Sequence, residues 1–121
     1  MRTAASLALG LFVGCLPLYG MQAWICLAVA LLLRLDFLVA FAATWVNNPL
    51  TGPLLVALEV EIGALLWTGR WMPVSVREAR AHGLGHLVGY ATLGSVAVGA
   101  LVAVLGALCV LLLARRKARG R

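Results

Sequence analysis

The chain has 121 residues, of which 64% are hydrophobic and 12% charged, and its formal net charge is +6. Uncharged runs cover residues 3–33, 37–58 and 87–114, and each exceeds the roughly 20 apolar residues that cross a bilayer. These features exclude an ordinary soluble domain and predict one small, all-α integral membrane domain of about five helices, several of them short.

The basic residues do not indicate a nucleic-acid partner, which would require basic and aromatic side chains interleaved on one face. Half of them follow the last apolar run directly, in the tail of residues 114–121: Arg115, Arg116, Lys117, Arg119 and Arg121. This position is typical of a cytoplasmic topology signal that contacts anionic membrane lipids. The three cysteines lie apart in apolar sequence, which predicts buried thiols and neither a metal nor a cofactor.

The first apolar segment, residues 4–33, predicts two short helices, over residues 4–16 and 20–33, joined by the turn PLYG at residues 17–20. Gly10 and Gly14 give the first helix a small face for close packing. This helix is only about 20 Å long at 1.5 Å per residue, too short to cross alone. The segment therefore favours a re-entrant hairpin with the turn at its tip, and two thin, tilted crossings are the alternative.

Arg34 and Asp36 form the first charged island after this hairpin. Asp36 is placed to cap a helix that starts at Phe37, and Arg34 suits the negative end of the preceding helix. We prefer this structural interpretation to a catalytic role for Asp36.

A polar break, WVNNPLTGP at residues 45–53, interrupts the second helical hairpin, residues 37–68. Pro49 disfavours helix at Asn48, so the preceding helix should end there. Thr51 can cap the next helix, whose first turn suits a proline. If this break lies at membrane depth, its free backbone groups must be buried in protein or line a wet cavity.

The break repeats the earlier turn, because PLTG at residues 49–52 matches PLYG at residues 17–20. Paired interruptions in corresponding segments are typical of transporter-like repeats. Two ordinary turns at the membrane boundary would give the same pattern, and both interpretations stay open here.

Glu59 and Glu61 lie within the fourth predicted helix. They are two positions apart and point about 200° from each other, so they cannot form one paired-carboxylate site. A carboxylate in the membrane is a functional candidate by default. We assign Glu61 to the interface near Arg70 and Trp71, and the role of Glu59 stays open.

Residues 72–82 are predicted to lie along the membrane surface. His82 and His86 have the i, i+4 spacing of metal-binding helices, but no third ligand is near in the sequence, so no metal site is predicted.

The last predicted helix, residues 85–113, is long enough to cross the membrane. Small residues form two packing surfaces on it: Gly85 with Gly89, and Ser95, Gly99 and Ala103. These would associate with the first four helices or with another copy of the protein. With the basic tail in the cytoplasm, the protein is expected to be multi-pass, with one net crossing before residue 68, most simply through the fourth helix.

Several stretches together resemble a bacterial membrane-protein family known as domain of unknown function twenty sixty-two: LPL…G at residues 16–20, ALLLRL at 30–35, ATWV at 43–46, NPLT at 48–51, and Gly63. The resemblance covers roughly residues 4–112. It departs at Asp36, where the family usually has Asn, and at Gly52, where it has a larger apolar residue. The family has no established activity, and fusions of some members to lipid-linked-sugar glycosyltransferases imply an envelope role.

We therefore expect a bacterial inner-membrane protein that transports or handles an anionic or lipid-linked substrate at its broken-helix termini. The candidate substrate-binding residues are Pro17, Tyr19, Gly20, Arg34, Asn47, Asn48, Pro49, Thr51 and Glu59. The alternative is a structural or assembly protein whose small-residue surfaces bind a membrane-protein partner, and either type is expected to be a homo-oligomer or to have such a partner. An enzyme is not predicted, because no nucleophile–base spacing or paired carboxylates occur.

Overall fold

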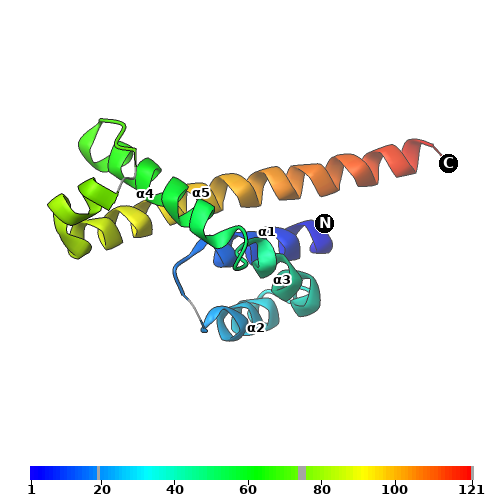
Figure 1. The fold of residues 1–121 in the computed structure, drawn as a ribbon. Coiled ribbons are helices and arrows are strands. Elements are labelled where there is room, and N and C mark those ends of the chain that lie inside the picture. Colours follow the sequence, from blue (N-terminus) through cyan, green and yellow to red (C-terminus); the bar gives the residue numbers. More distant parts are fainter. Residues whose placement is uncertain (19, 74–75, 121) are drawn as a thin grey trace.

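The computed structural model describes residues 1–18, 20–73 and 76–120, apart from the side chains of residues 76–80 and 82. The described residues form five α-helices and one 3-10 turn (Figure 1). These are α1 (Arg2–Cys15), α2 (Gln22–Leu32), α3 (Phe37–Ala43), η1 (Thr44–Val46), α4 (Gly52–Thr68) and α5 (Val76–Arg119). The predicted all-α class is thus confirmed for these residues.

The long helix α5 is the spine of the molecule, and α4 and α1 pack against it one after the other (Figure 1). Near the start of α5, Gly63 of α4 faces the backbone of Tyr90, and Gly94 of α5 faces the backbone of Glu59. Further along, Gly99 of α5 lies against Phe12 of α1, and Gly106 lies against the earlier residue Leu7. Both α1 and α4 therefore run antiparallel to α5.

Helices α1 and α3 run parallel to each other. Gly10 of α1 lies against Ala40 of α3, and Gly14 lies against Thr44 at the start of η1. Helix α2 connects α1 to α3 in the chain and runs back in the opposite direction. It packs on α3, and Cys26 is buried in the core that they share. As a result, the turn after α1 and the break after η1 lie at the same end of this three-helix group.

The link between α2 and α3 is fixed by capping. The Asp36 carboxylate accepts hydrogen bonds from the backbone N–H groups of Leu38 and Val39, at 3.0 and 3.3 Å. The predicted cap by Asp36 is thereby confirmed. Its own N–H donates to the Ser6 hydroxyl at 2.9 Å, and the Arg2 guanidinium donates to the Arg34 carbonyl. These bonds tie the link to the start of α1.

Some helix ends differ from the prediction. Helix α2 begins at Gln22 instead of residue 20, because Gly20 takes a left-handed conformation with φ 84°. Helix α5 continues to Arg119 instead of residue 113, because Ala, Arg and Lys form helix well and cations suit a helix C-terminus. At its other end α5 has a kink at Gly83, with φ 73° and ψ 152°.

Among the described helices, the part of α5 from Gly83 to Arg119 is long and apolar enough to cross a membrane. Only 17% of its apolar window is buried inside the molecule. The core helix of a soluble protein would be mostly covered, whereas large side chains such as Leu101, Leu105 and Leu112 are exposed here.

Candidate functional site

The two helix breaks line one pocket with a volume of about 310 Å³. That volume is at the lower end of the range for small-molecule sites, about 300–1,000 Å³. Its walls come from the start of α2 and from the region between α3 and α4: Gly20, Gln22 and Ala23 on one side, and Phe41, Thr44, Trp45, Asn47, Asn48 and Pro49 on the other. The parallel course of α1 and α3 is what brings these two stretches together.

The Gly14 carbonyl, in the last turn of α1, joins the two walls of the pocket. A carbonyl in the last turn of a helix has no partner within that helix. Here it accepts hydrogen bonds from the side-chain amide groups of Gln22, at 3.4 Å, and Asn47, at 3.2 Å. One backbone oxygen is thus bound by a side chain from the start of α2 and by another from the second break.

Asn48 satisfies the backbone of the second break. Its side-chain oxygen accepts hydrogen bonds from the N–H groups of Leu50 and Thr51, at 2.9 and 3.0 Å, and its amide nitrogen donates to the Trp45 carbonyl at 3.3 Å. The Thr51 hydroxyl donates to the Val46 carbonyl at 2.6 Å. The side chains of Asn48 and Thr51 therefore form their hydrogen bonds with the backbone of the turn itself.

The predicted side-chain cap of α4 by Thr51 is wrong. Thr51 holds the N-cap position, but its side chain accepts no hydrogen bond from the first turn of α4. The second residue of that turn is Pro53, which has no N–H to donate. The proline itself stands at the start of the helix, as predicted.

The start of α2 opens onto the pocket. Gln22 and Ala23 line it, and no side chain caps the helix at Met21. First-turn N–H groups carry the positive end of the helix dipole and favour anions or oxygen acceptors. No acidic side chain is among the described residues that line the pocket.

A family model described as "Uncharacterized protein conserved in bacteria (DUF2062)" matches residues 1–121. The chain belongs to this family. The family resemblance inferred from the sequence is thus confirmed. No curated protein and no solved structure matches this chain.

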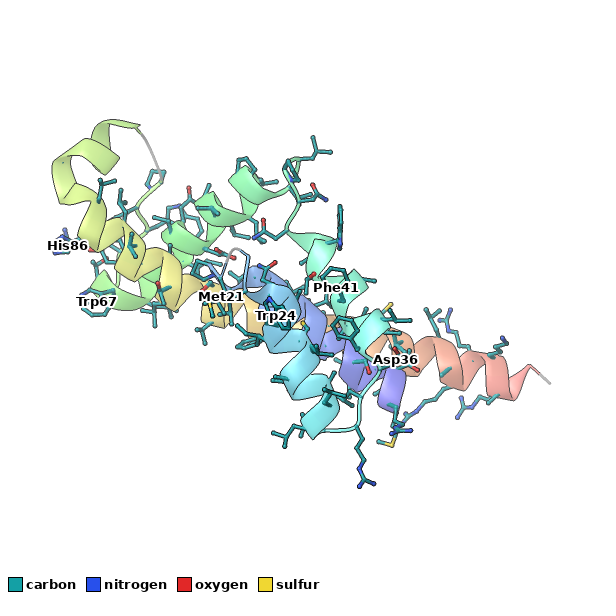
Figure 2. The ribbon with its side chains drawn as sticks, turned by 90° about the horizontal axis from the view of Figure 1, so that it is seen from below. Met21, Trp24, Asp36, Phe41, Trp67 and His86 are labelled. Atoms are coloured by element: carbon teal, nitrogen blue, oxygen red, sulfur yellow. The ribbon has the colours of Figure 1, made fainter. Side chains whose placement is uncertain are left out.

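Other predicted binding residues of this DUF2062 chain lie outside the pocket. Arg34 lies at the far end of α2, where it lines a separate polar hollow with Arg2 and Asp36. Figure 2 shows Asp36, which lines this hollow, further along the molecule than Met21 and Trp24 at the start of α2. Arg34 is therefore not placed to neutralise a ligand in the pocket.

The remaining candidates have separate positions. Pro17 and Thr51 are not among the residues that line the pocket. Glu59 lies inside α4 on the face that meets α5. Tyr19 lies outside the described residues.

Gln22 and Thr44 line the pocket but were not among the predicted site residues. Gln22 is the one side-chain amide in the uncharged run of residues 3–33, a signal that could have revealed it. Thr44 had no such signal, because its place depends on how α3 packs against α1.

The predicted packing residues of the family member divide into two groups. Ser95 and Gly99 are covered by the protein itself, and Gly99 lies against Phe12 and Cys15 of α1. Gly85 and Gly89 have nothing within 4 Å of an added side chain. They line an open groove of about 250 Å³ together with Trp67, His86 and Tyr90.

Proposed function

We propose that this protein resides in the bacterial inner membrane and holds the anionic head of a lipid-linked substrate in the pocket between its two helix breaks. Transport or handling of that substrate is the corresponding function. The observation that carries the proposal is the meeting of both breaks at one pocket onto which the start of α2 opens.

The proposal places the pocket within the bilayer. Both chain termini lie toward one end of the molecule (Figure 1), and Trp67 and His86 lie at the opposite end from Asp36 (Figure 2). Arg2, Arg34 and the basic tail then face the cytoplasm, in agreement with the positive-inside rule. Residues 37–68 and α5 cross the membrane in opposite directions.

In this arrangement α1 and α2 form a re-entrant hairpin beside the broken crossing. Their helices have 14 and 11 residues, too short to span singly. The tip of the hairpin meets the break part-way along residues 37–68. Irregular backbone at that depth is tolerated where it lines a cavity, and half-helix ends at midplane are the usual substrate sites of transporters.

The pocket suits a head group with an apolar tail. Its volume of about 310 Å³ accommodates a small polar group but not a long chain. Trp24 and Trp45, at 71% and 65% exposed, extend from the same two stretches toward the outside. Their large apolar rings would contact the tail of the substrate while it stays among the membrane lipids.

Filling the pocket should remove the bound lipid. In Ala23→Trp the indole would occupy the space beside Gln22, and we expect retention of added polyprenyl phosphate to fall by about tenfold or more. The measurement is mass spectrometry of the intact protein in mild detergent. Ala28→Trp is the matched control, because Ala28 is exposed on α2 and does not line the pocket. Equal retention by both variants and the wild type would refute the proposed site.

The open groove at Gly85 and Gly89 favours a second candidate function, assembly through helix packing. Small residues on a membrane helix let another helix approach closely. Gly89→Leu should therefore leave the fold intact and lower the oligomer mass in detergent, measured by light scattering. Gly99→Leu would not serve, because Gly99 packs against α1 of the same chain. An unchanged mass for Gly89→Leu would contradict this candidate.

A further inference from the structure

Among the described residues, Glu59 is the largest side chain that is fully buried, with 2% of its surface exposed. Its Oε1 atom has no hydrogen-bond partner among the residues that the structure describes. Asp36, by contrast, is exposed and caps a helix. Glu59 does not line the pocket between the breaks, so that site does not explain its burial.

The surroundings of Glu59 are apolar and tightly packed. On its own helix Val60 and Ala64 are buried with it, and on α5 the backbone at Gly94 touches the Glu59 carbonyl. The hydroxyl of Ser95, the residue after Gly94, donates its proton to the Thr92 carbonyl at 2.8 Å, so this proton is not donated to Glu59. A charged carboxylate would therefore be buried with Oε1 lacking any donor, which is strongly unfavourable.

Among the side chains that the structure describes, no positive group compensates for such a charge from the helices packed against Glu59. From α1 the titratable neighbour is Cys15, which lies within electrostatic range. From α5 it is Tyr90, one turn from Gly94, and that helix carries no charged residue from position 87 to 114. Helix α1 also ends at Cys15, and the negative end of a helix dipole disfavours a nearby anion.

We infer that Glu59 is a proton-binding site at the contact between α4 and α5. Its carboxyl group holds a proton while the two helices are packed and releases it when they part. Protonation of this one group thereby controls how tightly α4 is held on the spine of the molecule. The inference is independent of the lipid site, because it rests on a different contact.

An apolar carbodiimide tests the protonation state directly. The acid O–H adds across a C=N bond of the reagent, and the adduct rearranges to a stable N-acylurea without any further reactant. In native membranes at neutral pH we expect the label on Glu59, unchanged in Glu61→Gln and absent in Glu59→Gln, as read by peptide mass spectrometry. A wild-type protein labelled at Asp36 or Glu61 but not at Glu59 would overturn the inference.

Stability against pH gives a second readout in detergent. The packed form binds one more proton than the separated form, so raising the pH favours separation, and stability falls. Once Glu59 ionises freely in the separated form, the separation constant should rise about tenfold per pH unit in the wild type. In Glu59→Gln this dependence should vanish. A wild type as insensitive to pH as Glu59→Gln would also overturn the inference.

Discussion

Replacing Gly94 with alanine should strongly destabilise the protein, although alanine forms helix better than glycine. A Cβ atom at this position would overlap the backbone carbonyl of Glu59 across the α4–α5 contact. Overpacking costs about 1–3 kcal/mol where side chains can adjust. Here one helix backbone must move away from the other, so we expect a loss of about 3 kcal/mol.

Gly89→Ala is the matched control on the same helix. Nothing lies within 4 Å of a Cβ atom added at Gly89, so the helix propensity of alanine should stabilise this variant by up to about 1 kcal/mol. The two substitutions are chemically identical and should have opposite signs. Melting temperatures in one detergent provide the comparison. Equal effects would show that α4 and α5 do not meet at Gly94.

Replacing Asn48 with leucine should destabilise the turn at the second helix break. The side chain keeps its approximate size but loses the oxygen that binds the N–H groups of Leu50 and Thr51. At the proposed depth in the membrane no water can replace the lost acceptor, and a polar group left without a partner there costs about 1–3 kcal/mol or more. We expect a loss of about 3 kcal/mol in the free energy of unfolding.

Asn47→Leu provides the comparison one residue away. The Asn47 amide makes one side-chain hydrogen bond, to the Gly14 carbonyl, which Gln22 also binds. We therefore expect a smaller loss of about 1 kcal/mol. Denaturation in detergent measures both variants. A larger loss for Asn47→Leu than for Asn48→Leu would contradict the assignment of Asn48 as the residue that holds the break.

The helix ends near prolines could be predicted because local chemistry sets them. Pro49 cannot continue a helix, and Asp36 can cap one, wherever the rest of the chain lies. Gly20, by contrast, was predicted to start the second helix but is part of the turn, because it takes a left-handed conformation. Whether Gly20 belongs to the helix or to the turn depends on the direction in which α2 must return.

The pocket could be predicted only in part, because its walls depend on packing between distant segments. Gly10 and Gly14 indicated close helix packing, but the sequence does not show that α3 is the partner or that it runs parallel to α1. The contribution of Gln22 follows from that arrangement. The sequence predicts Arg34 as a binding residue, yet the length of α2 separates it from the pocket.

The central claim is that the two helix breaks meet around one pocket in the membrane. Cross-linking of Ala23→Cys with Pro49→Cys tests it most directly in native membranes. Cys109 is replaced by serine, because it is exposed, contrary to the prediction from sequence, whereas Cys15 and Cys26 are buried as predicted. A short bis-maleimide should join the pair within one chain, whereas Ala28→Cys with Pro49→Cys should not be joined. Cysteines at positions 23 and 49 that react only separately, each with its own reagent molecule, would contradict the account.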